Sequence, residues 1–312
     1  MNFLEFKEKY QKAEVLEFSS STPKNPIVSV LVQTYQHKDF IGECLDSILM
    51  QETTFEYEIL IGEDGSVDGT REICIEYANK YPEKIRLFLH HPENKISVLN
   101  NITGNFNALY NFYSAKGKYI AFCEGDDKWG DPLKLQRQVE FLENNPDFVL
   151  SFHRYRENYE IPIKDQPKLL EQVVHNISEE QLQRLLFHPL LSTVCFRNII
   201  TELPSEISEV INVDSFPFSL LGAYGDAKYQ DEISPGIYRI HFGGIWSIRN
   251  KELKLKTKIQ TFNSLIIYYM RQNNHELVKF FKATKRNHVR MLFLHYLKHF
   301  KFFKTAFLLR KL

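Results

Sequence analysis

The most constraining feature of the sequence is a short apolar run that ends in three carboxylates. Residues Tyr119 to Cys123 are long enough for one buried strand, and Glu124, Asp126 and Asp127 follow directly. In open α/β sheets, ligands bind outside the carboxyl ends of the strands. Carboxylate oxygens suit Mg²⁺ or Mn²⁺, which often reach phosphates through one or two carboxylates. The stretch therefore indicates a metal or phosphate site at a strand end; the alternative is a strand followed by an acidic, solvated turn.

Two segments upstream show the same arrangement of an apolar run followed by polar residues, at 27–34 and 57–64. Each precedes a segment with apolar residues at helical spacing, at 39–50 and 70–80. Alternating strands and helices predict a parallel sheet with helices on its faces. The polar residues at the strand ends would then gather along one edge of that sheet.

Composition argues against some classes of protein. Equal numbers of acidic and basic residues give the 312-residue chain a net charge of zero, so no overall field favours nucleic acid as a partner. The N-terminal residues are charged throughout, unlike a signal peptide, and no apolar run of about 18 residues would span a bilayer. The four cysteines are widely spaced and predict reduced core thiols in a cytoplasmic protein.

Three motifs in order carry a resemblance to a known family. They are VSVLVQTY at 28–35, GEDGSVDGT at 62–70 and GKYIAFCEGDDKW at 117–129. They resemble the bacterial family 2 nucleotide-sugar glycosyltransferases, and the match extends over about 26–145. The resemblance implies the GT-A fold, a Rossmann-like, mostly parallel sheet flanked by helices. It also implies metal-dependent, inverting transfer of a sugar from a nucleotide donor to a surface-polysaccharide or lipid-linked glycan acceptor.

On this basis we expect three parts in the chain. Residues 1–26 would form an amphipathic helix, over 3–18, and a linker. Residues 27–250 would form the GT-A domain, with a nucleotide-binding part up to 153 and an acceptor part after it. Residues 251–312 would be a helical extension. Within the acceptor part we expect helices at 178–186 and 214–221, a strand at 192–196 and a hairpin-like segment at 229–246.

The resemblance also implies roles for residues on the donor side. Asp126, with Asp127 next, would hold Mn²⁺ or Mg²⁺, which stabilises the diphosphate leaving group. Glu124 stands where the family usually has aspartate, and its longer arm suggests an outer-shell or ribose-facing role. The resemblance implies that the acid at the end of the second strand hydrogen-bonds the base of the nucleotide, which is expected to be uracil. The residues expected around the nucleotide are Thr34, Tyr35, Glu63, Asp64 and Asn105. Asp68 suits a helix cap better than a nucleotide contact.

On the acceptor side, Asp214 resembles the family's late acidic motif before a helix and is the candidate general base; its alternative role is an N-cap. Arg239 and His241 alternate along a predicted strand and would face the diphosphate together, with His241 also able to join the metal. Trp246 would stack on the sugar or close a lid over the site. Weaker acceptor contacts are predicted at Ser192, Thr193 and Arg197.

Other interpretations of the motifs are less favourable. An EF-hand loop starting at Asp64 requires an acid at Ile75, and a phosphatase-like Asp-x-Asp requires one at Ser66. A nucleotidyltransferase of related fold remains an alternative, but the segment after Thr34 is not a glycine-rich loop. A catalytically inert membrane scaffold is the alternative outside enzymes, and the intact acids argue against it.

The segment 278–312 contains no acid, and its lysines and arginines are interleaved with aromatic residues. This pattern favours a helix lying on an anionic membrane, which predicts a cytoplasmic protein peripheral to the inner face of the cell membrane. The alternative is a helical hairpin packed on the core with a basic, solvated side.

Overall fold

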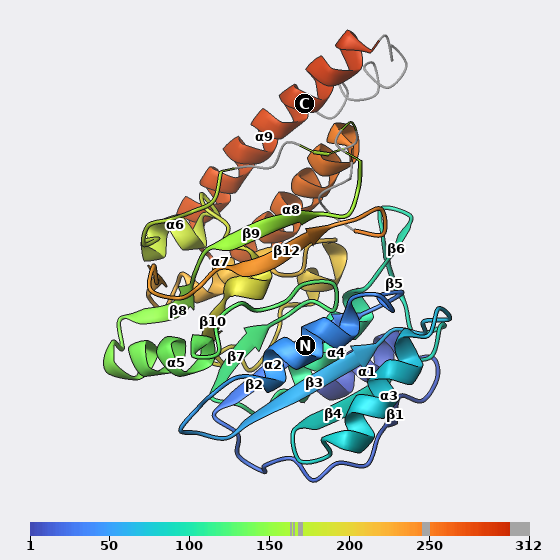
Figure 1. The fold of residues 1–312 in the computed structure, drawn as a ribbon. Helices are drawn as coiled ribbons and strands as arrows, with labels where there is room; N and C mark the ends of the chain where they lie inside the picture. The colour runs from blue at the N-terminus through green and yellow to red at the C-terminus, as the bar shows by residue number, and fades with distance from the viewer. Residues whose placement is uncertain (163, 165, 168–170, 245–249, 300–312) are drawn as a thin grey trace.

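The computed structural model describes all residues except 163, 165, 168–170, 245–249 and 300–312. In the described residues, the largest sheet has eight strands in the order β1-β4-β3-β2-β7-β10-β8-β11 (Figure 1). The strands are β1 (Leu16–Glu17), β2 (Val28–Thr34), β3 (Tyr57–Glu63), β4 (Ile85–Leu89), β7 (Tyr119–Phe122), β8 (Phe148–Phe152), β10 (Cys195–Arg197) and β11 (Asp226–Tyr229). β1 and β10 run antiparallel to their neighbours and the others share one direction. The predicted mostly parallel α/β sheet is confirmed.

The sheet separates two hydrophobic cores because successive side chains of a strand point to opposite faces. Val30 and Val32 of β2 belong to one core, whereas Leu31 belongs to the other. The helices that supply the first core are α2 (Ile41–Leu49), α3 (Thr70–Lys80) and α5 (Lys134–Asn144). The helices that supply most of the second are α1 (Phe3–Tyr10), α4 (Asn105–Ser114), α7 (Ser215–Leu221), α8 (Lys251–Arg271) and α9 (His275–Lys298). Burial on both faces explains why the central strands are apolar throughout.

The strand order reverses between β2 and β7. From β2 the chain moves outward through β3 to β4, and it then returns through α4 to place β7 on the other side of β2. Ligands of open α/β sheets bind at such a reversal, beside the carboxyl ends of the strands. The fold therefore brings the segment after Thr34 and the acidic loop after Phe122 to one place.

The predicted N-terminal helix over 3–18 is too long. Helix α1 ends at Tyr10, and the chain then forms edge strand β1, which pairs with β4. The side chain of Asn94 accepts hydrogen bonds from the backbone amides of Lys12 and Ala13 and donates one to the carbonyl of Ala13. These bonds hold the backbone away from helical geometry.

The hairpin predicted at 229–246 is wrong. Strand β11 pairs with β8 in the main sheet, and β12 (Gly236–Ile240) pairs in parallel with β9 (Tyr155–Tyr159), far upstream in the sequence. β12 is also joined to the acidic loop, because Ile237 and Lys128 exchange backbone hydrogen bonds of 2.7 and 3.2 Å. Pairing across more than 70 residues leaves no local signal in the sequence.

The remaining elements are short. They are β5 (Ile96–Val98), β6 (Asn101–Thr103), α6 (Glu179–Gln183), and the 3₁₀ helices η2 (Leu191–Thr193) and η3 (Ser205–Glu209). Helix α6 and strand β10 are shorter than the predicted 178–186 and 192–196, and α7 begins after Asp214.

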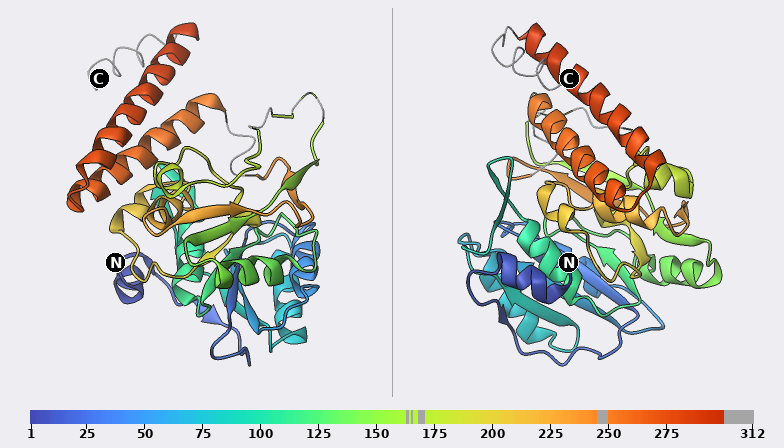
Figure 2. Two further views of the ribbon diagram at one scale, coloured as in Figure 1. Left: turned by 90° about the vertical axis from the view of Figure 1, so that its left-hand side faces the viewer. Right: turned by 180° about the vertical axis from the view of Figure 1, so that it is seen from behind.

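The C-terminal helices α8 and α9 lie side by side along the outer end of the molecule (Figure 2). Phe262 of α8 and Phe281 of α9 stack at 5.9 Å within the second core, so the hairpin packs on the domain. In the part of the chain that the structure describes, no helix is long and apolar enough to cross a membrane.

Candidate functional site

The acidic loop after β7 lies close against the segment that follows β2. The amide of Gly125 donates to the carbonyl of Gln33 at 2.9 Å, which extends the β2–β7 pairing into the loop. A Cβ at Gly125 would lie 2.8 Å from Thr34 and 2.9 Å from Nδ1 of His37. This approach requires glycine, which explains the glycine among the acids.

Three side chains from distant segments converge at this point. Nε2 of His241, just after β12, lies 3.0 Å from Oδ2 of Asp126, and Nε2 of His37 lies 3.8 Å from the same oxygen. One nitrogen or oxygen of each of the three residues lies within 4.8 Å of the others. His37, Asp126 and His241 are hereafter called the His–Asp–His cluster. The predicted meeting of Asp126 and His241 is thus present in the structure.

The acids of the loop differ in charge state. Desolvation opposes ionisation of Asp126, but the hydrogen bond from His241 and the neighbouring His37 outweigh it, so the pKa of Asp126 lies below its usual range. Burial, then the charges of Asp126 and Asp127, raise the pKa of Glu124 well above its usual value. Burial also lowers the pKa of His37, which favours the neutral form of its imidazole. The cluster is therefore built around one ionised carboxylate.

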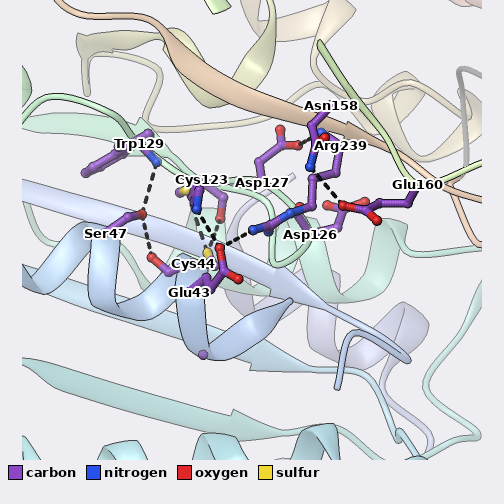
Figure 3. Close-up of polar contacts among 12 residues, drawn as sticks. Glu43, Cys44, Ser47, Cys123, Asp126, Asp127, Trp129, Asn158, Glu160 and Arg239 are labelled. Atoms are coloured by element: carbon purple, nitrogen blue, oxygen red, sulfur yellow. Dashed lines mark hydrogen bonds and ion pairs between the residues drawn. The ribbon is translucent and has the colours of Figure 1, made fainter. Parts of the chain in front are cut away.

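Asp127 and Arg239 hold the loop against β12 rather than facing an open cleft. Oδ1 of Asp127 accepts the backbone amide of Arg239 at 3.0 Å, and its Oδ2 is buried without a partner. The guanidinium of Arg239 donates to the carbonyl of Asp126 at 2.9 Å and to Glu43 at 2.6 Å (Figure 3). The predicted role of Arg239 as a diphosphate ligand does not match these contacts, because its guanidinium is committed to the loop. Asp127 is bound only through Oδ1, so its role as a metal ligand stays a prediction.

At the end of β3, the two neighbouring acids differ. Glu63 is fully buried, and its oxygens accept the amide of Ser66 at 2.6 Å and Nε of Arg71 at 2.5 Å, so protein groups enclose its carboxylate. Asp64 pairs with Lys95 at 2.5 Å and has one oxygen without a partner. Burial raises the pKa of Asp64 to about 6, although Lys95 opposes the shift. Of these two acids, Asp64 is therefore the one with an oxygen that can accept a further hydrogen bond.

The ring of Tyr35 is 52% exposed at the same edge, and Nζ of Lys95 lies 5.4 Å from its centre. Thr34 is buried beside it and approaches Nδ1 of His37 at 3.3 Å. Asp68 accepts hydrogen bonds from the amide and hydroxyl of Thr70, the first residue of α3, but the N-cap position itself is Gly69.

Asp214 lies at the carboxyl ends of β2 and β7. It is the N-cap of α7 and accepts the amide of Ser215. A small cavity of about 30 Å³ brings it together with Gln33 of β2 and Phe122 of β7. The charge of Asp214 contributes to the raised pKa of Glu124, so the two carboxyl groups lie within electrostatic range. Nε2 of His188 lies 3.6 Å from Oδ2 of Asp214.

Several predicted contacts lie away from this site. Arg197 lies opposite Tyr119 at the start of β7, because β10 runs antiparallel to β7, and it binds the carbonyls of Leu142 and Phe148. Asn105 is buried and donates to the carbonyl of Val210 at 2.6 Å. Arg197 and Asn105 therefore support the fold.

Ser192 and Thr193 are buried beside the acidic loop. The carbonyl of Ser192 accepts the indole of Trp129, and its side chain lowers the pKa of Asp127 against the larger effect of burial. Trp246 lies outside the described residues.

The sequence prediction missed His37, His188 and the anchoring role of Glu43. The position of His37 in the sequence could have identified it, because it lies only a few residues after the end of β2. The prediction already used residues at strand ends. His188 and Glu43 left no such signal, because their roles depend on tertiary contacts.

The chain belongs to glycosyl transferase family 2, whose model matches residues 29–200, more than half of the chain. It is 38% identical over 138 residues to an uncharacterised protein of Mycobacterium tuberculosis, covering 44% of this chain and 38% of that protein. It is 35% identical over 117 residues to TuaG of Bacillus subtilis, a putative teichuronic acid biosynthesis glycosyltransferase, covering 38% of this chain and 42% of TuaG. The chain thus spans about two fifths of the length of these curated relatives.

Solved structures share the fold. Staphylococcus aureus TarS 1–349 in complex with UDP-GlcNAc superposes with a TM-score of 0.54 at 17% identity, covering 77% of this chain and 66% of that chain. The mannosyltransferase PcManGT of Pyrobaculum calidifontis, in complex with GDP-Man and Mn²⁺, gives 0.53 at 15% identity, covering 90% and 80%. At these identities the likeness concerns the fold.

The Asp64–Lys95 pair generates a prediction about stability. Because the pKa of Asp64 is higher in the folded protein than in the unfolded chain, its ionisation costs stability, and this cost appears as the pH rises through about 6. Lys95→Met removes the compensating charge. We expect the free energy of unfolding at pH 7.5 to fall by about 1–3 kcal/mol, with a smaller loss at pH 5, in urea denaturation.

Adding Asp64→Asn to Lys95→Met should restore most of the loss at pH 7.5. The matched control is Lys118→Met, which removes a partner of exposed Glu143 and should cost less than about 1 kcal/mol at either pH. An equal loss at pH 5 and 7.5 for Lys95→Met would show that the side chain acts by packing and not by charge.

Proposed function

We propose that this chain transfers a sugar, with inversion, from a UDP-sugar to a surface-polysaccharide or lipid-linked glycan acceptor. The observation that carries the proposal is the convergence of an ionised Asp126, His241 and, at the same strand ends, Asp214 on a family 2 fold. Such a reaction requires a place for the diphosphate and a base for the acceptor hydroxyl.

The donor nucleotide is proposed to bind at the end of β3. The exposed ring of Tyr35 offers a stacking surface for a base, and Asp64 has a free oxygen to accept its N–H group. TarS is in complex with UDP-GlcNAc and PcManGT with GDP-Man, so both uracil and guanine nucleotides occur on this fold. We favour uracil because one carboxylate oxygen matches its single N3–H donor.

A divalent cation, Mn²⁺ or Mg²⁺, fits the site because Asp126 is ionised beside imidazole nitrogens and no cationic side chain pairs with its carboxylate oxygens among the described residues. Bound there, the cation would stabilise charge on the departing diphosphate as a Lewis acid. The residues of the chain fix its position: Arg239 and the exchanged backbone bonds of β12 hold the loop that carries Asp126.

Asp214 is the proposed general base. Its carboxylate is only partly buried, and it has capacity beyond the single bond to Ser215. His188 lies close enough to orient it. Proton transfer from the acceptor hydroxyl to Asp214 would accompany attack on the anomeric carbon.

The acceptor and location follow from weaker observations. TuaG is named for teichuronic acid biosynthesis, which supports a surface polymer as the product. The exposed side of α9 carries Lys279, Lys282, Arg286, Arg290, Met291, Leu294 and Leu297. Basic residues followed by exposed apolar residues suit an anionic lipid surface, and we propose peripheral binding at the cytoplasmic face of the membrane.

The donor proposal is tested with Asp126→Asn. This variant keeps the size of the side chain but removes the charge, so binding of UDP-sugars that depends on Mn²⁺ should be lost. Thermal-shift titration with UDP-, GDP- and dTDP-sugars, each with and without Mn²⁺, measures both base preference and metal dependence, since ligands stabilise the state that they bind. Equal shifts for both proteins in the presence and absence of EDTA would contradict the assignment.

The general base is tested with Asp214→Asn. Asparagine caps helices as well as aspartate does, so the melting temperature should change little, whereas turnover should fall about 10²–10⁴-fold. Turnover is measured as UDP released with extracted lipid-linked glycans as acceptor, and donor binding serves as the control. Near-normal turnover would limit Asp214 to its capping role.

Membrane binding is tested by replacing Lys279, Lys282, Arg286 and Arg290 with glutamine. Each basic residue contributes about 1 kcal/mol near an anionic surface, so partitioning onto phosphatidylglycerol vesicles should fall at least about tenfold. The matched control carries the same change at exposed Lys9, Lys80, Lys116 and Lys118. Equal binding of both variants would show that α9 is not the membrane contact.

A further inference from the structure

The His–Asp–His cluster contains one residue that hydrogen bonding does not explain. Oδ2 of Asp126 already has a hydrogen bond with His241 at 3.0 Å. His37 approaches the same oxygen at 3.8 Å, which is too long for a hydrogen bond. Two imidazoles aimed at one carboxylate oxygen, one of them without a bond to it, suggest that a ligand belongs between them.

The separations match ligands of a single cation. Ligand atoms about 2.1 Å from an ion lie about 3.0 Å apart at adjacent octahedral positions and about 4.2 Å apart at opposite ones. The three residues present ligand atoms 3.0 and 3.8 Å apart, all within 4.8 Å of one another. An ion in this space therefore requires only small shifts of side chains.

The orientation of His37 is fixed from several sides. Its backbone amide donates to Oγ1 of Thr70 at 2.8 Å, and its carbonyl accepts the amides of Phe40 and Ile41. Its Nδ1 lies 3.3 Å from Oγ1 of Thr34, which leaves Nε2 directed at Asp126. A histidine that binds a metal through one nitrogen usually holds the other by such a contact.

We propose that His37 is a third protein ligand of the cation, and that the His–Asp–His cluster selects a transition ion such as Mn²⁺, Fe²⁺ or Co²⁺ over Mg²⁺. Imidazole suits transition ions, whereas Mg²⁺ prefers oxygen ligands and retains its waters. The inference rests on the proposed function only in taking Asp126 as the metal carboxylate. The new element is His37, whose imidazole would make the site prefer a transition ion to Mg²⁺.

The test counts nitrogen ligands with Mn²⁺ alone. Pulsed electron paramagnetic resonance of the full-length protein with bound Mn²⁺ should show coupling to two imidazole nitrogens, and His37→Gln should show one. Competition titrations should show that the preference for Mn²⁺ over Mg²⁺ falls at least about tenfold in this variant. The matched control is His91→Gln, which alters an exposed histidine outside the cluster and should leave both results unchanged.

Thr34→Val provides a second variant in case His37→Gln disturbs folding. It keeps the shape of a buried residue but removes the hydroxyl beside Nδ1, and it should weaken Mn²⁺ binding by a smaller factor. Two nitrogen couplings retained in His37→Gln, or an unchanged preference between the ions, would overturn the proposal. The Mn²⁺ measurements contain no sugar nucleotide, so they do not depend on the proposed function. If two nitrogens hold Mn²⁺ but a separate assay with UDP-sugars detects no UDP release, the proposed function is overturned and this inference stands.

Discussion

The geometry of the site depends on the contacts by which Arg239 fixes the acidic loop. Its backbone amide binds Asp127 and its guanidinium binds the carbonyl of Asp126, while Glu43 of α2 anchors the far side of the guanidinium. The guanidinium is almost fully buried, which strengthens its bond to the carbonyl of Asp126, whereas its partner Glu43 is 56% exposed and is screened by solvent. These contacts join β12 to α2 and to the loop, and they place His241 beside Asp126.

This arrangement explains why the acids after β7 behave differently. Burial alone would raise the pKa of each one, and it does so for Glu124 and Asp127. Asp126 differs because two histidines adjoin its carboxylate, which keeps it ionised. A carboxylate that stays ionised beside imidazole nitrogens has the electrostatic character of a cation site.

Much of the site could be predicted because it lies at strand ends. The alternation of apolar strands and helices predicts the parallel sheet, and the acids after β3 and β7 then share its carboxyl edge with Thr34. The acceptor half was harder. Arg197 was predicted to face the site, but the antiparallel course of β10 carries it to the other end of the sheet, and nothing local specifies strand direction. β9 and β12 form a pair across a long stretch of chain for which neither segment has a distinctive pattern.

The errors among the polar residues have a common physical cause. Glu63, Arg239 and Asn105 are the right residue types for a ligand site, yet each is buried and bonded to the backbone or to another side chain. A polar group buried without partners is costly, so most buried polar groups near a site are used to shape it. The residue type alone does not distinguish a side chain that binds a ligand from one that shapes the site. An oxygen or nitrogen without a hydrogen-bond partner does distinguish them. One carboxylate oxygen of Asp64 has no hydrogen bond. Nε2 of His37 faces Asp126 at 3.8 Å, which is longer than a hydrogen bond. Such residues are therefore the ones to which the ligand chemistry of this fold is best assigned.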